Sequence, residues 1–176
     1  MKSTALAYLL LTATMPIWAA GSVSDYAGQQ GREIKALSAQ EIDGLLAGRG
    51  MGLGKSAELN RYPGPAHVLE LATPLALTDQ QLAASQAIHA RMLERAQQAG
   101  ARLVEAEAAL EQRFQAGSID AQSLREALER IGQLQAAVRG AHLLAHVEQH
   151  AVLTPEQIER YVHLRGYAQG RSHDRH

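Results

Sequence analysis

The stretch over residues 77–157 constrains the fold most, because the same pattern, L-T-x-x-Q, marks both of its ends. The first copy spans residues 77–81 and the second spans 153–157. In each copy the Thr stands where a helix N-cap belongs, and the Gln follows three residues later. The two side chains can therefore bond reciprocally to backbone N–H groups that a helix start leaves unpaired. A leucine precedes each Thr, and Leu82 or Ile158 follows each Gln, which completes a hydrophobic staple. The sequence predicts two helix starts.

Between these starts, apolar residues recur at spacings of three, four or seven, which is the period of an amphipathic helix. Gly117 can end a first long helix over about residues 79–116, and Asp120 can cap a second over about residues 121–151. So short a connection forces an antiparallel pair. The predicted fold class is all-α, a long antiparallel helical hairpin over 78–152 with short flanking helices. Because much of the seam is Ala, which buries little area, we expect a homodimer.

Weaker signals flank the hairpin. Ser38 and Glu41 form a third capping box, which predicts a short helix that ends near Gly48. Pro65 suits the first position of another short helix, and a closing helix is expected over about residues 155–165. We assign these elements and the hairpin to one domain over 38–168.

Glycines alternate in the segment 48–54, directly before Lys55 and a serine. A phosphate-binding loop needs a glycine five residues before the Gly of its Gly-Lys-Ser, and that position holds Arg49. We therefore interpret the segment as a tight turn that packs closely on the hairpin, with Met51 and Leu53 turned inward.

The N-terminal residues have the composition of an export signal. A signal peptide has a basic start, an apolar run and then small residues, and here these are Lys2, residues 5–15 and the residues around Gly21. We assign residues 1–21 to such a signal peptide. The run is shorter than the roughly 20 residues that a membrane span needs, so we expect a periplasmic protein without stable membrane insertion. The polar residues 22–37 are interpreted as a flexible arm, and 169–176 as a frayed tail.

Charge and residue types argue against two classes of protein. The formal net charge is −1, both signs are interspersed, and aromatics make up 4% of the chain, so neither a basic stripe nor a stacking platform for nucleic acid is present. The chain has no cysteine, no H-E-x-x-H motif and no serine in a nucleophile-elbow context. We therefore expect a non-enzymatic protein that requires no cofactor.

Histidines form the most suggestive polar pattern. His142, His146 and His150 recur every four residues along one side of a helix, and each neighbouring pair can chelate one divalent ion. Folding the hairpin brings His89 close to this row, and His67 on the preceding short helix can add a further ligand. Imidazole favours Zn²⁺, Cu²⁺ or Ni²⁺. The competing interpretation is that these are ordinary surface or core residues, since a chain with eight histidines often contains such pairs. A further candidate pair, His173 and His176, lies in the tail.

The predicted export signal, the long hairpin and the two L-T-x-x-Q copies together resemble the Spy/CpxP family of periplasmic proteins and the related heavy-metal resistor proteins. The likeness covers about residues 66–165. It implies a small α-helical protein, typically a curved antiparallel dimer, in the response to envelope or metal stress. Some members hold unfolded clients without ATP, some restrain a sensor kinase, and others bind zinc, nickel or related metals. The glycine-containing segment 48–65 departs from the shorter members.

Two functional hypotheses follow. The leading one is a non-enzymatic chaperone that binds apolar segments of unfolded or stressed envelope proteins through the hairpin. Its candidate contact residues are Leu93, Leu103, Leu110, Leu134 and Leu144. The alternative is a periplasmic heavy-metal binding, resistance or sensing protein that uses the histidines named above. The expected partners are unfolded periplasmic proteins or a sensor protein.

Overall fold

The computed structural model describes residues 23–168. The expected signal peptide over 1–21 and the tail histidines His173 and His176 lie outside the described residues. The chain divides after Gln30 into a small N-terminal unit and a larger unit that begins at Gly31. Residues 23–30 form turns, and all helices belong to the larger unit.

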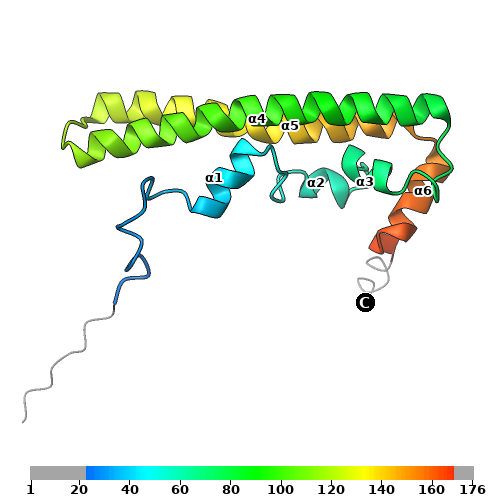
Figure 1. Cartoon of the computed structure of the whole chain (residues 1–176), viewed down its shortest axis with the longest axis horizontal. Coiled ribbons are helices and arrows are strands. Elements are labelled where there is room, and N and C mark those ends of the chain that lie inside the picture. Colours follow the sequence, from blue (N-terminus) through cyan, green and yellow to red (C-terminus); the bar gives the residue numbers. More distant parts are fainter. Residues whose placement is uncertain (1–22, 169–176) are drawn as a thin grey trace, which may run out of the picture. The chain divides into compact units, whose positions relative to one another are not determined.

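Six helices and no strand occur in the described part of the larger unit. They are α1 (Ala39–Leu46), α2 (Lys55–Glu58), α3 (Pro65–Glu70), α4 (Asp79–Gln115), α5 (Ala121–Val152) and α6 (Pro155–Leu164). The long helices α4 and α5, of 37 and 32 residues, pack side by side over their length (Figure 1). The predicted all-α hairpin with short flanking helices is confirmed.

Side-chain caps hold the helix starts that the sequence indicates. Thr78 and Thr154 each accept a hydrogen bond from the backbone N–H three residues later. Gln81 and Gln157 in turn accept from the backbone N–H of those threonines, at 3.1 and 2.9 Å. Ser38 begins α1 with the same reciprocal arrangement. Local sequence therefore determines where these three helices start.

The chain reverses between α4 and α5 where the glycine signal lies. Gly117 has a φ of 62°, which glycine adopts without the steric cost that a side chain would impose. Asp120 then accepts hydrogen bonds from the backbone N–H groups of Gln122 and Ser123, at 3.0 and 2.8 Å. The short turn makes the two long helices antiparallel.

The two L-T-x-x-Q copies meet at the open end of the hairpin. Nε2 of Gln81 donates to Oε1 of Gln157 at 2.8 Å, and Nε2 of Gln157 donates to Oε1 of Gln81 at 3.0 Å. The same two amides also donate to the backbone carbonyls of Val152, at 3.0 Å, and Leu75, at 3.3 Å. Each glutamine therefore caps its own helix and ties it to the other helix start.

Two apolar clusters form the core. The first lies along the hairpin and comprises Leu45, Leu103, Ile131, Leu134 and Val138. The second lies at the open end and comprises Val68, Leu75, Leu153, Ile158 and Tyr161. Gly100 of α4 lets α1 approach the first cluster, because a Cβ there would lie 2.2 Å from the carbonyl oxygen of Leu45.

The short helices α1, α2 and α3 lie along one side of the hairpin (Figure 1), where α1 and α3 contact α4 and α2 contacts α5. Residues two positions apart on a helix point about 160° apart. Gly100 faces α1, so Arg102 points away from it. His142 faces Gly50, so Leu144 points away from that loop. The hairpin thus has a covered side, under α1–α3, and an opposite side that these helices leave open, called the uncovered side with respect to residues 23–168.

Two details differ from the sequence-based expectation. Met51 is 47% exposed, so the prediction that it turns inward is wrong, whereas Leu53 does pack against the first cluster. At the end of the expected flexible arm, Ile34 is buried and Lys35 forms an ion pair with Glu111 of α4. This part of the arm is therefore packed on the helical unit. Over the described residues, no helix combines the length and apolar character needed to cross a bilayer.

Candidate functional site

Two of the predicted metal-ligating histidines come together on the covered side. His142 and His146 of α5 are buried, at 4% and 9% exposure. Both line a cavity of about 490 Å³ between α5 and the glycine-rich segment. This cavity is the candidate functional site of the covered side.

The other three histidines have separate surroundings. His67 lines the same cavity from α3, but its Nδ1 lies 3.1 Å from the carboxylate of Glu70. His150 stacks on Tyr62, with ring centroids 4.5 Å apart. His89 is half-buried on α4 and does not line the cavity. The five histidines therefore do not form one cluster.

Glycines make the close approach to the two buried histidines possible. A Cβ at Gly54 would lie 2.6 Å from Nε2 of His146, and one at Gly64 would lie 2.9 Å from Cε1 of the same ring. A Cβ at Gly50 would lie 3.8 Å from both Nδ1 and Cε1 of His142. The glycine-rich segment therefore packs on the hairpin as predicted, and its backbone forms one wall of the cavity.

His146 is held by a backbone acceptor. Its Nδ1 lies 2.7 Å from the carbonyl oxygen of Tyr62, and because a carbonyl only accepts, this nitrogen carries the proton. Oε2 of Glu58 lies 3.7 Å from the same nitrogen. The ring orientation is fixed by these two contacts.

Glu58 is the centre of the polar network beside the cavity. Its carboxylate accepts hydrogen bonds from the backbone N–H of Gly64, at 3.2 Å, and from the hydroxyls of Tyr161, at 2.5 Å, and Tyr167, at 3.1 Å. Nε of Arg165 lies 3.6 Å away. The side chain is only 12% exposed. These contacts join α2 to α6 and to the residues that follow α6.

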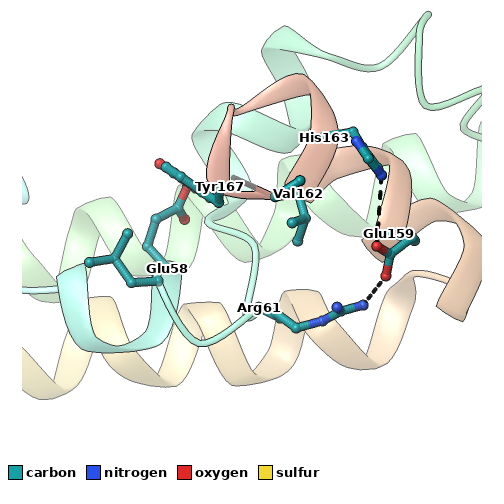
Figure 2. A pocket seen from close by; sticks show the side chains of 8 residues that line it. Glu58, Arg61, Glu159, Val162, His163 and Tyr167 are labelled. Carbon is teal, nitrogen blue, oxygen red and sulfur yellow. Dashed lines mark hydrogen bonds and ion pairs between the residues drawn. The ribbon is translucent and has the colours of Figure 1, made fainter. Parts of the chain in front are cut away.

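A second cavity, of about 250 Å³, shares Glu58, Leu59 and Tyr167 with the first (Figure 2). Glu58 and Tyr167 form part of its wall, and the ion pair between Arg61 and Glu159 crosses its rim. His163 lies 3.9 Å from Glu159. The charged groups around this cavity are thus engaged with one another.

Burial changes the acid–base properties of Tyr161. Its side chain is fully buried, and this burial raises the pKa of the hydroxyl well above the ordinary tyrosine value. The hydrogen bond to Glu58 and the negative charge of that carboxylate raise the pKa further. Tyr161 therefore remains a hydrogen-bond donor to Glu58 at neutral pH.

His142 is affected in the opposite direction. Burial lowers the pKa of its imidazole, and the nearby His146 lowers it further. Its Nε2 is buried and has no hydrogen-bond partner. The structure thus holds a neutral imidazole with one unsatisfied nitrogen.

The charges around the cavity do not favour a metal ion. Within residues 23–168, no group of three or more histidine, aspartate or glutamate side chains is placed to hold one. The charges of Arg165 and Glu58, which both line the cavity, offset each other, and the positive charge of Lys55 that is left would repel a divalent cation. Metal binding by these histidines stays a prediction.

The leucines predicted to contact clients lie in different environments. Leu103 and Leu134 belong to the first apolar cluster and are each 5% exposed. Leu93 lies against Gly48 on the covered side, and Leu110 is half-buried. Leu144 is 55% exposed. In this conformation Leu103 and Leu134 offer almost no surface to a client, whereas more than half of the surface of Leu144 is exposed.

Two grooves run between α4 and α5 on the uncovered side. The first, of about 420 Å³, is lined by small and apolar residues together with two arginines, including Arg95, Ala99, Arg102, Leu134, Ala141 and Leu144. The second, of about 240 Å³ and nearer the turn, includes Ala106, Leu110, Arg113, Glu126, Ala127 and Arg130. Three of the five candidate leucines therefore line these grooves.

Sequence reasoning missed Glu58. It is one acidic residue in a four-residue helix, and its side-chain partners Tyr161 and Tyr167 are more than 100 residues away in sequence. The one available signal is the small number of aromatic residues. A buried tyrosine usually has a hydrogen-bond partner for its hydroxyl, so a partner is expected for each tyrosine that is buried.

Comparisons with known proteins give no relative for this chain: no family model, no curated protein and no solved structure matches it.

Proposed function

We propose that the protein is a non-enzymatic periplasmic stress protein that binds apolar segments of unfolded or stressed envelope proteins without ATP. The observation that carries this proposal is the pair of apolar grooves on the uncovered side of the hairpin. The apolar N-terminal residues and the resemblance to the Spy/CpxP family support export and a role in envelope stress.

The shape of the uncovered side suits weak and adaptable contacts. Ala99, Ala137 and Ala141 leave the first groove shallow, and Leu144 stands at its edge with more than half of its surface exposed. Contacts of this kind bury little area each, so they can accept many sequences without holding any of them tightly.

The charges of the grooves favour clients of a particular kind. Four arginines and one acidic residue, Glu126, line the two grooves; the arginines are Arg95, Arg102, Arg113 and Arg130. Positive charges beside an apolar strip attract segments in which acidic and apolar residues are mixed, and they speed encounter with such segments.

A client-aggregation assay with one matched pair of variants tests the proposal. Leu144→Ser removes an exposed leucine beside the groove, whereas Leu128→Ser removes a leucine of similar exposure, 51%, on the same helix. The two leucines point about 160° apart around α5. Leu144 lines the first groove, whereas Leu128 lines neither groove. We expect Leu144→Ser to weaken suppression of aggregation several-fold and Leu128→Ser to leave it unchanged. Equal effects, or no suppression by the unmodified protein at several-fold excess, would contradict the proposal.

Homodimer formation, a sensor-protein partner and heavy-metal binding stay predictions from the sequence. Size measurement by light scattering decides the first. Calorimetric titration with Zn²⁺, Cu²⁺ and Ni²⁺ decides the last, with a His142→Ala/His146→Ala double variant as the control.

A further inference from the structure

The two ring nitrogens of His142 differ in their surroundings. Nδ1 and Cε1 are the ring atoms that face Gly50 and the cavity, whereas Nε2 is buried without any hydrogen-bond partner. Buried N–H groups without an acceptor are rarer in proteins than unsatisfied acceptors. The neutral ring therefore carries its proton on Nδ1, and the cavity receives a hydrogen-bond donor.

The same assignment argues against a metal ion at this ring. A metal bound at Nδ1 would force the proton onto Nε2, and a ligating histidine almost always donates its second N–H to an acceptor. Nε2 of His142 has no acceptor. The cavity therefore suits a ligand that accepts a hydrogen bond.

The charges that line the cavity point to an anionic acceptor. Lys55 is exposed, and its ammonium has no ion-pair partner among the described residues. Arg165 and Glu58 also line the cavity, and Nε of Arg165 lies 3.6 Å from the Glu58 carboxylate, so these two opposite charges offset each other. The positive charge of Lys55 is left over, and the cavity keeps an excess of positive charge.

We propose that this cavity binds a small oxyanion, a carboxylate or a phosphate, with Nδ1–H of His142 and the ammonium of Lys55 as donors. Gly50 and Gly52 form the facing wall, where the absence of side chains lets the ligand approach the backbone. The cavity is separate from the grooves of the uncovered side. Anion binding can therefore be tested without regard to whether the protein binds clients.

Nitrogen-15 NMR of the histidine rings tests the proposal directly, because it reports which ring nitrogen carries the proton. The protein is titrated with inorganic phosphate and, separately, with acetate, at constant ionic strength maintained with chloride. We expect the His142 Nδ1–H signal to shift while Nε2 keeps the signature of an unprotonated nitrogen. A response to both anions assigns the shared oxyanion chemistry, and a response to one alone assigns phosphate or carboxylate. No shift at His142 with either anion would overturn the proposal.

Three variants separate a binding site from a general effect on the fold. Lys55→Gln, at an exposed position, is expected to weaken binding about 2–5-fold, as for an exposed charge pair. His142→Phe keeps a buried ring but removes the donor, and is expected to weaken binding about tenfold or more. His89→Phe, on a ring outside the cavity, is expected to change nothing. Unchanged binding in both Lys55→Gln and His142→Phe would overturn the proposal, as would Zn²⁺ binding that moves the His142 proton to Nε2.

Discussion

The covered and uncovered sides of the hairpin are built from the same two helices but are stabilised differently. On the covered side, Glu58 and His146 belong to a largely buried network of specific polar contacts, and glycine backbone packs against His142 and His146. On the uncovered side, alanines and Leu144 border open grooves with arginines at the rim. Buried polar contacts require one geometry, whereas a shallow apolar surface tolerates change. The two sides should therefore respond differently to the same substitution.

The largest expected effect is loss of Glu58. Glu58→Ala would leave the hydroxyl of Tyr161 buried without an acceptor and Arg165 without its counter-charge. We expect a loss of about 2–4 kcal/mol in the free energy of unfolding, measured in urea. The matched control is Glu70→Ala, at an exposed side chain, for which we expect a change within about 0.5 kcal/mol. Similar small effects for both variants would show that the network does not stabilise the fold.

The second largest effect on stability is expected when a methyl group is added to a glycine on the covered side. Gly100→Ala would place a Cβ 2.2 Å from the carbonyl oxygen of Leu45, so α1 must move away from α4. We expect a destabilisation of about 1–3 kcal/mol in thermal or urea unfolding. A neutral result would mean that α1 is held only loosely against the hairpin.

The pH dependence of stability tests the burial of Tyr161. Its pKa is raised in the folded state, so the folded chain binds the hydroxyl proton more tightly than the unfolded chain does. The stability that this provides is complete below the ordinary tyrosine pKa of about 10 and is lost as the pH rises above it, at up to about 1.4 kcal/mol per pH unit. Unfolding measured between pH 8 and 11 should show this slope. Tyr161→Phe should reduce it, whereas Tyr26→Phe, at an exposed tyrosine, should retain it.

The smallest effect is expected for a glycine-to-alanine substitution on the uncovered side. Gly140 lines the first groove, and a Cβ there would meet nothing within 4 Å. Gly140→Ala should therefore stabilise the protein by about 0.5–1 kcal/mol, because alanine loses less backbone entropy in a helix. Opposite signs for Gly100→Ala and Gly140→Ala would confirm the contrast between the two sides. A destabilising Gly140→Ala would contradict it.

The sequence predicts well those features that depend on residues close together in the chain. The capping boxes at Ser38, Thr78 and Thr154 and the turn at Gly117 lie where they were expected, since each involves only a few consecutive residues. Helical periodicity then determines the hairpin, because a short turn between two long helices permits only an antiparallel arrangement.

Features that depend on distant residues were not predictable in the same way. The contacts of Glu58 with Tyr161 and of Gln81 with Gln157 join residues 103 and 76 positions apart. Periodicity places His142, His146 and His150 on one side of α5, but it does not show that Tyr62 occupies the space beside His150. Which neighbours a side chain meets is decided by how the short helices pack on the hairpin.

The reciprocal pair of Gln81 and Gln157 has a consequence for how the chain opens. Gln81 caps α4, Gln157 caps α6, and their amides hydrogen-bond to each other. Detachment of α6 would therefore remove a partner of the residue that caps α4. The first turns of α4 and α6 should therefore open together, as one cooperative unit. Amide protons in the first turns of α4 and α6 should exchange with solvent at similar rates, although they are separated by more than seventy residues.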